Sequence, residues 1–172
     1  MILKFLNSSI KTIFIIAFTI FLNACSSENN TSATSSTKTV TQLPLAALTV
    51  PNPSGLSAHI ILDGNAASPI AMTIDNVAGT ATANITGLTL ASHTVQIVYE
   101  YNDGVTTYTL AQSTEHTVDL TSGSATYNIP DTDYDTASFD QDSDGLSNAM
   151  ELAAGTNPND AGCVLGISLV GS

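Results

Sequence analysis

The chain has 172 residues, a length that fits one folded domain with at most a small addition. Only 10% of the residues are charged, against about 25% in ordinary soluble domains, and 15 acids stand against three basic residues, Lys4, Lys11 and Lys38. Because no Lys or Arg follows residue 38, the rest of the chain has no permanently positive side chain to neutralise phosphates, which argues against nucleic acids as partners. Cations are the partners that such an acidic surface favours.

The first 24 residues have the pattern of a secretory signal. Two lysines precede an apolar run at 13–22, whose ten residues are about half of what a membrane-spanning helix needs. The run ends in Leu-Asn-Ala-Cys at 22–25, which resembles the lipobox of bacterial lipoproteins. The resemblance implies cleavage before Cys25, its lipidation, and anchoring in the bacterial outer membrane, facing the periplasm or the exterior. The alternative is an ordinary secretory signal with a chance cysteine.

The segments at the two ends of the expected domain are simple in composition. Residues 25–42 comprise the lipidated cysteine and a Ser/Thr-rich stretch that we expect to be a flexible tether.

With Cys25 used for lipid, Cys163 has no partner for an intramolecular disulfide. We expect Cys163 either to be buried with the apolar tail 163–172 or to pair with another molecule.

Residues 43–130 alternate apolar and polar side chains in short runs with turn signals about every ten residues. The Asn-Asp-Gly sequence at 102–104 favours a hairpin turn, because these residues tolerate positive φ. About seven short strands in about 90 residues fit a mainly β protein built as a two-layer antiparallel β-sandwich. The predicted strands lie at 56–62, 70–74, 81–85, 93–101, 105–111, 118–120 and 127–129.

One stretch of this region supports a more specific architecture. The sequence ITGLTLASHTVQIVYEY at 85–101 resembles the strand-loop-strand of immunoglobulin-like and fibronectin type III-like modules of bacterial surface proteins. The resemblance implies an immunoglobulin-like sandwich over 43–130, followed by a small loop-helix motif.

Residues 131–162 are acidic, and 140–151 have the pattern D-x-D-x-D-G-x5-E. Alternate side chains of a curled loop point to one centre, and a glycine permits the sharp turn. Ca²⁺ takes about six to eight oxygen ligands, so the spacing predicts a calcium site. A helix over 147–154, ended by Gly155, would return Glu151 to the loop. A solvated acidic turn is the alternative.

The segment resembles the calcium-binding loops of EF-hands and, more closely, thrombospondin type 3 and dockerin-like repeats, which need no helix before the loop. The resemblance implies calcium as the cofactor. The ligand positions are then Asp140, Asp142, Asp144, Leu146 through its backbone carbonyl, Asn148 directly or through water, and Glu151.

A weaker second site would use Asp131, Asp133 and Asp135, which repeat the alternate spacing. Thr136 stands where the loop needs a glycine, so a solvated linker is the alternative reading of this stretch.

Other chemistry is sparse in the sequence. His59, His93 and His116 fall on three different predicted strands, and their spacing matches no zinc motif. We expect packed or surface histidines, with His59 facing outward and the other two on the apolar side.

The expected role is non-catalytic: a structural or adhesion module of the envelope with a protein or glycan ligand. A component of an envelope or secretion assembly and a hydrolase with a cryptic site are the alternatives.

Overall fold

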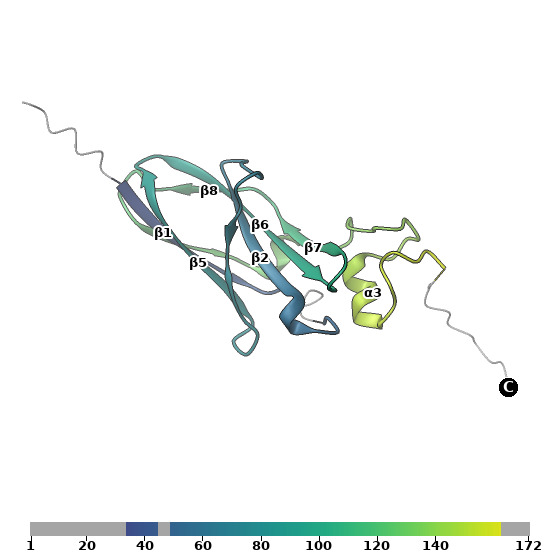
Figure 1. The fold of residues 1–172 in the computed structure, drawn as a ribbon. Coiled ribbons are helices and arrows are strands. Elements are labelled where there is room, and N and C mark those ends of the chain that lie inside the picture. The colour runs from purple at the N-terminus through teal and green to yellow at the C-terminus, as the bar shows by residue number, and fades with distance from the viewer. Residues whose placement is uncertain (1–33, 45–48, 163–172) are drawn as a thin grey trace, which may run out of the picture. The chain divides into compact units, whose positions relative to one another are not determined.

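A computed structural model describes residues 34–44 and 49–162, and these residues are mainly β (Figure 1). The predicted signal peptide 1–24, Cys25 and the tail 163–172 with Cys163 lie outside the described residues. The described part contains no helix with the length and apolar character needed to cross a membrane.

Two sheets carry the strands. The first has four strands in the order β4-β5-β1-β9, and the second has the order β10-β7-β6-β2-β3, with β8 also paired to β6. The pairing of β1 with β9 is parallel, and the other pairings in these sheets are antiparallel. The strands are β1 (Thr34–Gln42), β2 (Leu56–Leu62), β3 (Ile70–Ala71), β4 (Thr73–Asp75), β5 (Thr80–Thr89), β6 (Ser92–Asn102), β7 (Thr107–Ser113), β8 (His116–Asp119), β9 (Ala125–Ile129) and β10 (Tyr134–Asp135).

Each predicted strand has a counterpart, with one division. The run 70–74 is broken at Met72, because β3 pairs with β2 in one sheet while β4 pairs with β5 in the other. The chain therefore changes sheets within this run. Met72 is buried, and its backbone N–H donates to the carbonyl of Ala58 at 2.9 Å.

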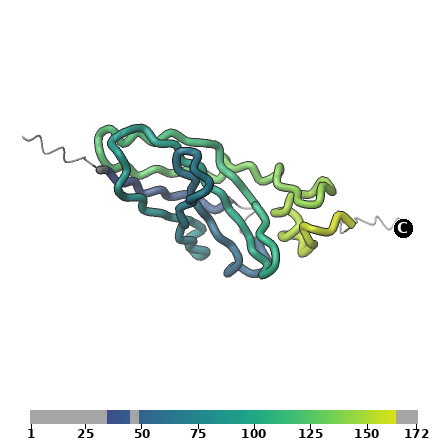
Figure 2. The backbone as a smooth tube through the Cα atoms, turned by 45° about the horizontal axis from the view of Figure 1, so that its top comes forward, coloured from purple at the N-terminus to yellow at the C-terminus, as the bar shows by residue number. Residues whose placement is uncertain are grey.

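Alternation along β6 supplies the centre of the core. Val95, Ile97, Tyr99 and Tyr101 are at most 4% exposed. The ring of Tyr99 meets that of Tyr134 edge to face at 5.4 Å, which fixes the start of the acidic segment against the core. The acidic segment that follows is yellow-green in Figure 2 and extends beyond one end of the strands. There, α3 (Asn148–Ala154) lies beside β7.

The prediction of a tether over 25–42 was wrong for residues 34–42. These residues form β1, which pairs with β5 on one side and with β9 on the other. The side chains of β1 that turn inward are hydroxyls rather than hydrocarbons, and Thr37, Thr39 and Thr41 are at most 2% exposed. Threonine is β-branched and suits a strand, and a buried hydroxyl can bond to a neighbouring carbonyl.

The hydroxyls of β1 differ in their bonding. Thr41 Oγ1 donates to the carbonyl of Ile129 at 2.8 Å and lies 2.7 Å from the hydroxyl of Tyr134. Thr39 Oγ1 is buried and has no hydrogen-bond partner in the part of the chain that the structure describes. A buried polar atom without a partner destabilises the fold, so the two threonines have opposite effects on stability.

Replacing Thr39 by Val is expected to raise the free energy of unfolding by about 1 kcal/mol, because it removes an unpaired hydroxyl and conserves shape. Thr41→Val is expected to lower it by about 1–2 kcal/mol, because two polar partners lose a hydrogen bond. Urea denaturation measures both changes. Two variants that unfold like the parent protein would show that these residues are a tether after all.

Candidate metal centre

The loop 140–147 brings three carboxylates together. Asp140, Asp142 and Asp144 each offer one oxygen within 4.8 Å of the oxygens of the other two. Asp140 maintains the curl, since its Oδ1 accepts the N–H of Ser143 at 2.7 Å and its Oδ2 accepts that of Gly145 at 3.0 Å. Ser143 and Gly145 have φ of 63° and 98°, the left-handed backbone that a tight loop requires.

Three oxygens of the site have no hydrogen-bond donor among residues 34–44 and 49–162. Asp142 Oδ1 accepts the N–H of Asp144 at 3.3 Å, and Asp144 Oδ1 accepts the N–H of Leu146 at 2.8 Å. The Oδ2 atoms of these two aspartates are buried and unpartnered, as is Oε2 of Glu151. Burying carboxylate oxygens without a partner is costly, so this arrangement calls for a proton or a cation.

Glu151 reaches the site from the short helix α3. The side chain of Ser147 caps the helix by accepting the N–H of Met150 at 3.4 Å, and Gly155 ends it with φ of 78°. This agrees with the helix predicted over 147–154. Glu151 is 0% exposed, and burial, followed by the charges of Asp142 and Asp144, raises the pKa of its carboxyl. It stands outside the 4.8 Å group of the three aspartates.

Two further predicted ligand positions differ in what the structure gives them. Leu146 is half-buried, and its backbone carbonyl remains the group predicted to bind the ion. The amide of Asn148 is engaged by the protein: Oδ1 accepts the N–H of Gln141 at 2.9 Å, and Nδ2 donates to the carbonyl of Thr109 at 3.0 Å. Asn148 N–H also donates to the carbonyl of Phe139 at 2.7 Å, so this residue closes the loop at its neck.

The weaker second set does not converge. Within residues 34–44 and 49–162, the group of three or more metal-ligating side chains is that of the loop, and it includes none of Asp131, Asp133 and Asp135. Asp135 Oδ1 accepts the N–H groups of Ala137 and Ser138, and Asp133 Oδ2 lies 3.4 Å from His116 Nε2. The alternate spacing therefore serves a turn and a contact with His116 here, and Asp131 and Asp133 lie in a short 3-10 helix (Asp131–Asp133).

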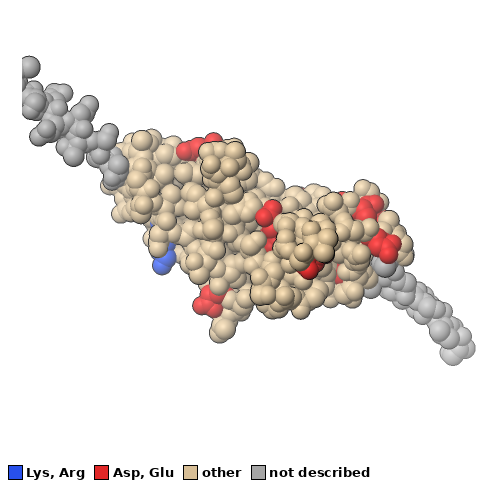
Figure 3. Space-filling model, in the orientation of Figure 1, with Lys and Arg blue, Asp and Glu red and all other residues tan. Residues whose placement is uncertain are grey.

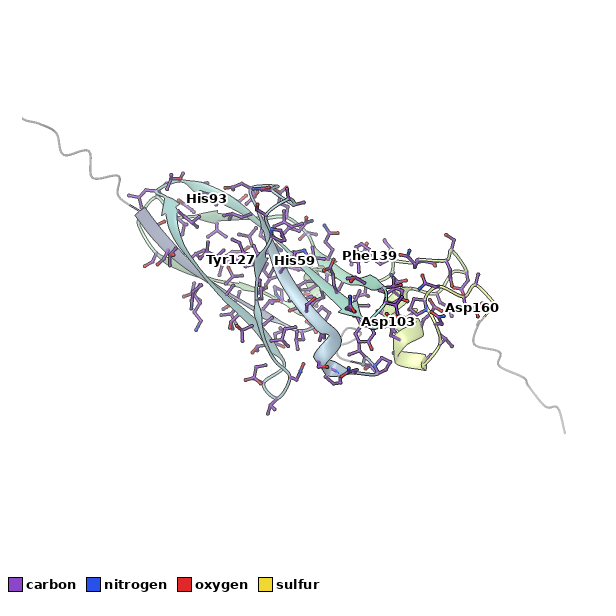
Figure 4. All side chains as sticks on the ribbon, viewed as in Figure 1. His59, His93, Asp103, Tyr127, Phe139 and Asp160 are labelled. Atoms are coloured by element: carbon purple, nitrogen blue, oxygen red, sulfur yellow. The ribbon has the colours of Figure 1, made fainter. Side chains whose placement is uncertain are left out.

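Each histidine lies beside a carboxylate, and the best-bonded is His93 (Figure 4). Its Nδ1 is 2.8 Å from Asp63 Oδ2, and its Nε2 is 3.1 Å from the carbonyl of Thr89 and 3.3 Å from the hydroxyl of that residue. Carboxylate and carbonyl oxygens only accept hydrogen bonds, so these contacts favour the protonated ring. The hydrogen bond to Asp63 raises the pKa of His93. This geometry suits a ring that bridges the ends of neighbouring strands, rather than a general base beside a hydroxyl nucleophile.

Figure 3 shows a mostly uncharged surface with carboxylates in separate places, several of them at the end that carries the acidic segment. The donor set of the loop consists of oxygens alone. Hard cations such as Ca²⁺ prefer oxygen ligands, whereas zinc and copper sites use nitrogen or sulfur. The buried, unpartnered oxygens and the left-handed loop backbone both fit a calcium ion.

Comparison with known proteins identifies the same segment. Residues 140–161 match the family described as Bacterial TSP3 repeat, so the chain carries a TSP3 repeat over the loop, the helix and the residues after it. None of the curated proteins matches the chain. Among solved structures, the chain is similar to the Gamma-CGTASE from Alkalophilic bacillus clarkii, with a TM-score of 0.42 and 15% identity. This match covers 56% of the chain and 15% of that enzyme, and the likeness supports no conclusion about function.

Glu151→Gln is expected to act in opposite directions with and without calcium. In chelator, the substitution removes a buried charge and is expected to raise the free energy of unfolding by about 1–3 kcal/mol. In millimolar calcium, the parent protein gains stability and the variant does not. Thermal unfolding in both conditions measures this, with the exposed Glu115→Gln as control. An equal loss of stability in both conditions would mean that a protein donor, rather than an ion, holds Glu151.

Proposed function

We propose that the protein is a non-catalytic, calcium-binding lipoprotein of the bacterial envelope. The observation that carries the calcium assignment is the set of buried oxygens of Asp142, Asp144 and Glu151 that have no donor, inside a segment that matches a TSP3 repeat. Ca²⁺ accepts irregular geometry and several carboxylates, whereas Mg²⁺ demands a near-ideal octahedron and keeps its waters. A loop that curls around three aspartates suits the larger ion.

The ion is proposed to have a structural role. Extracellular sites of this kind bind calcium at about 10⁻⁴–10⁻³ M, so the site would be filled constantly outside the cytoplasm rather than act as a sensor. Filling the site offsets the repulsion among Asp140, Asp142, Asp144 and Glu151 and orders the segment.

The lipobox-like sequence at 22–25 supports anchoring through a lipidated Cys25 in the outer membrane. The protein would then present its β-sandwich as a structural or adhesion module, toward the periplasm or the exterior, to a protein or glycan ligand. The mostly uncharged surface over the strands supports recognition by hydrogen bonding and shape rather than by charge (Figure 3).

Calorimetric titration of the protein with calcium at millimolar concentrations is expected to show binding to one site. Asp144→Asn removes one of the buried oxygens and is expected to weaken binding at least about tenfold, or to abolish it, since each lost carboxylate weakens an oxygen-ligated site. Asp131→Asn is the matched control, because this exposed aspartate lies outside the cluster, and its affinity is expected to equal that of the parent. A flat titration of the parent protein would contradict the proposal.

Cys25→Ser is expected to release the protein from the membrane fraction and to abolish labelling by a fatty acid in bacterial cells. Cys163→Ser is the control, since it removes the other cysteine and leaves the lipobox intact. A parent protein that is absent from the membrane fraction and takes up no fatty acid, like the Cys25→Ser variant, would show an ordinary secretory signal.

A further inference from the structure

The helix α3 belongs to the sandwich core as well as to the metal loop. Ala149 and Leu152 are 1% and 7% exposed and are part of the same buried cluster as Tyr108 and Leu110 of β7. Burial of a leucine contributes about 2 kcal/mol, so α3 cannot leave this place without exposing apolar surface of the sandwich. Glu151 lies in the same helix, and the charges of Asp142 and Asp144 help burial to raise the pKa of its carboxyl.

A second link joins the loop to β7 through one side chain. Asn148 accepts from the N–H of Gln141 inside the loop and donates to the carbonyl of Thr109 in β7. The side-chain amide bridges the two parts, so a loop that opens loses its bond to the strand at the same time.

The third link reaches the turn between β6 and β7. Asn159, near the end of the repeat, donates from Nδ2 to the hydroxyl of Tyr108 at 2.5 Å. That hydroxyl donates at 3.0 Å to Oδ2 of Asp103, the residue labelled beside the acidic segment in Figure 4. Asp103 Oδ1 in turn accepts the N–H groups of Val105 and Thr106, both at 2.7 Å. A single hydroxyl thus joins the repeat to the carboxylate that shapes the hairpin tip.

The surroundings of Tyr108 are consistent with this position between the two sites. Tyr108 is 1% exposed, and burial first, then its hydrogen bond to Asp103, raises the pKa of its hydroxyl. The charge of Glu151 acts on it in the same direction.

We propose that ion binding in the loop orders the tip of the β6–β7 hairpin, residues 102–107, through Asn148, Asn159 and Tyr108. The inference rests on the proposed calcium site. Without the ion, the four carboxylates repel one another, and a charged Glu151 is not stable in its buried place. As α3 loosens, Asn159 releases Tyr108 and the tip loses a support. The ion would thereby hold in place a turn that exposes Val105, which is 93% accessible.

Hydrogen exchange of the full chain, read by mass spectrometry in millimolar calcium and in chelator, tests the relay. Calcium is expected to slow exchange about tenfold or more both in 140–156 and in the hairpin tip. Exchange in β2 serves as the internal reference. Asn159→Ala removes the hydrogen bond from the repeat to the hydroxyl of Tyr108, at an exposed position. In this variant, calcium is expected still to slow exchange in the loop but no longer to slow exchange at the hairpin tip.

A second pair of variants keeps the test valid if Asn159→Ala fails to fold. Tyr108→Phe removes only the hydroxyl and is expected to reproduce the effect of Asn159→Ala, with calcium affinity unchanged by calorimetry. Tyr127→Phe is the matched control, because that hydroxyl bonds to His116 and not to the repeat, and it is expected to behave like the parent. Calcium protection of the loop without any change at the tip overturns the relay and leaves the calcium site standing. The absence of both calcium heat and loop protection overturns both.

Discussion

Carboxylate oxygens that are buried without a donor are the constraint on which this structure depends. After residue 38 the chain has no Lys or Arg, so no permanently charged side chain of that part can compensate them. One such oxygen belongs to each of Asp142, Asp144 and Glu151. The other oxygen of each carboxylate accepts a hydrogen bond, from a backbone N–H group in the two aspartates and from the Thr156 hydroxyl in Glu151. A proton or a cation from outside the chain must compensate these oxygens, and a set of oxygen ligands favours the dication that we propose. On this proposal, calcium is part of the fold.

The same shortage of cations explains the histidines. Each of the three stands within 3.6 Å of a carboxylate, and the hydrogen bond to Asp63 raises the pKa of His93. Asp63 and the carbonyl of Thr89 hold this ring at the strand ends. Two kinds of compensation for carboxylates thus act in different places: histidine rings among the strands and, on our proposal, a metal ion beyond them. The helix α3 joins the two regions because it packs on β7 and also carries Glu151.

Local signals in the sequence were sufficient for much of the fold and for the centre of the site. Alternation located β2 and β6, and the spacing of acids with Gly145 and the helix caps located the loop and α3. The strand β1 was missed because its inward face is made of threonines, so that its period of two had no hydrophobic signal. Tertiary contacts decided the rest: the amide of Asn148 is bonded to β7, and Asp133 lies beside His116 of β8. No local pattern reports such partners.

The most direct test of the central claim is crystallography of the protein grown with calcium, using the anomalous signal of the ion. The account predicts one peak in the loop, at about 2.3–2.6 Å from oxygens of Asp140, Asp142 and Asp144, with the carboxylate of Glu151 joining them. Density that shows no ion in millimolar calcium, with the free oxygens of Asp142, Asp144 and Glu151 bonded to protein donors or sharing protons, would contradict it.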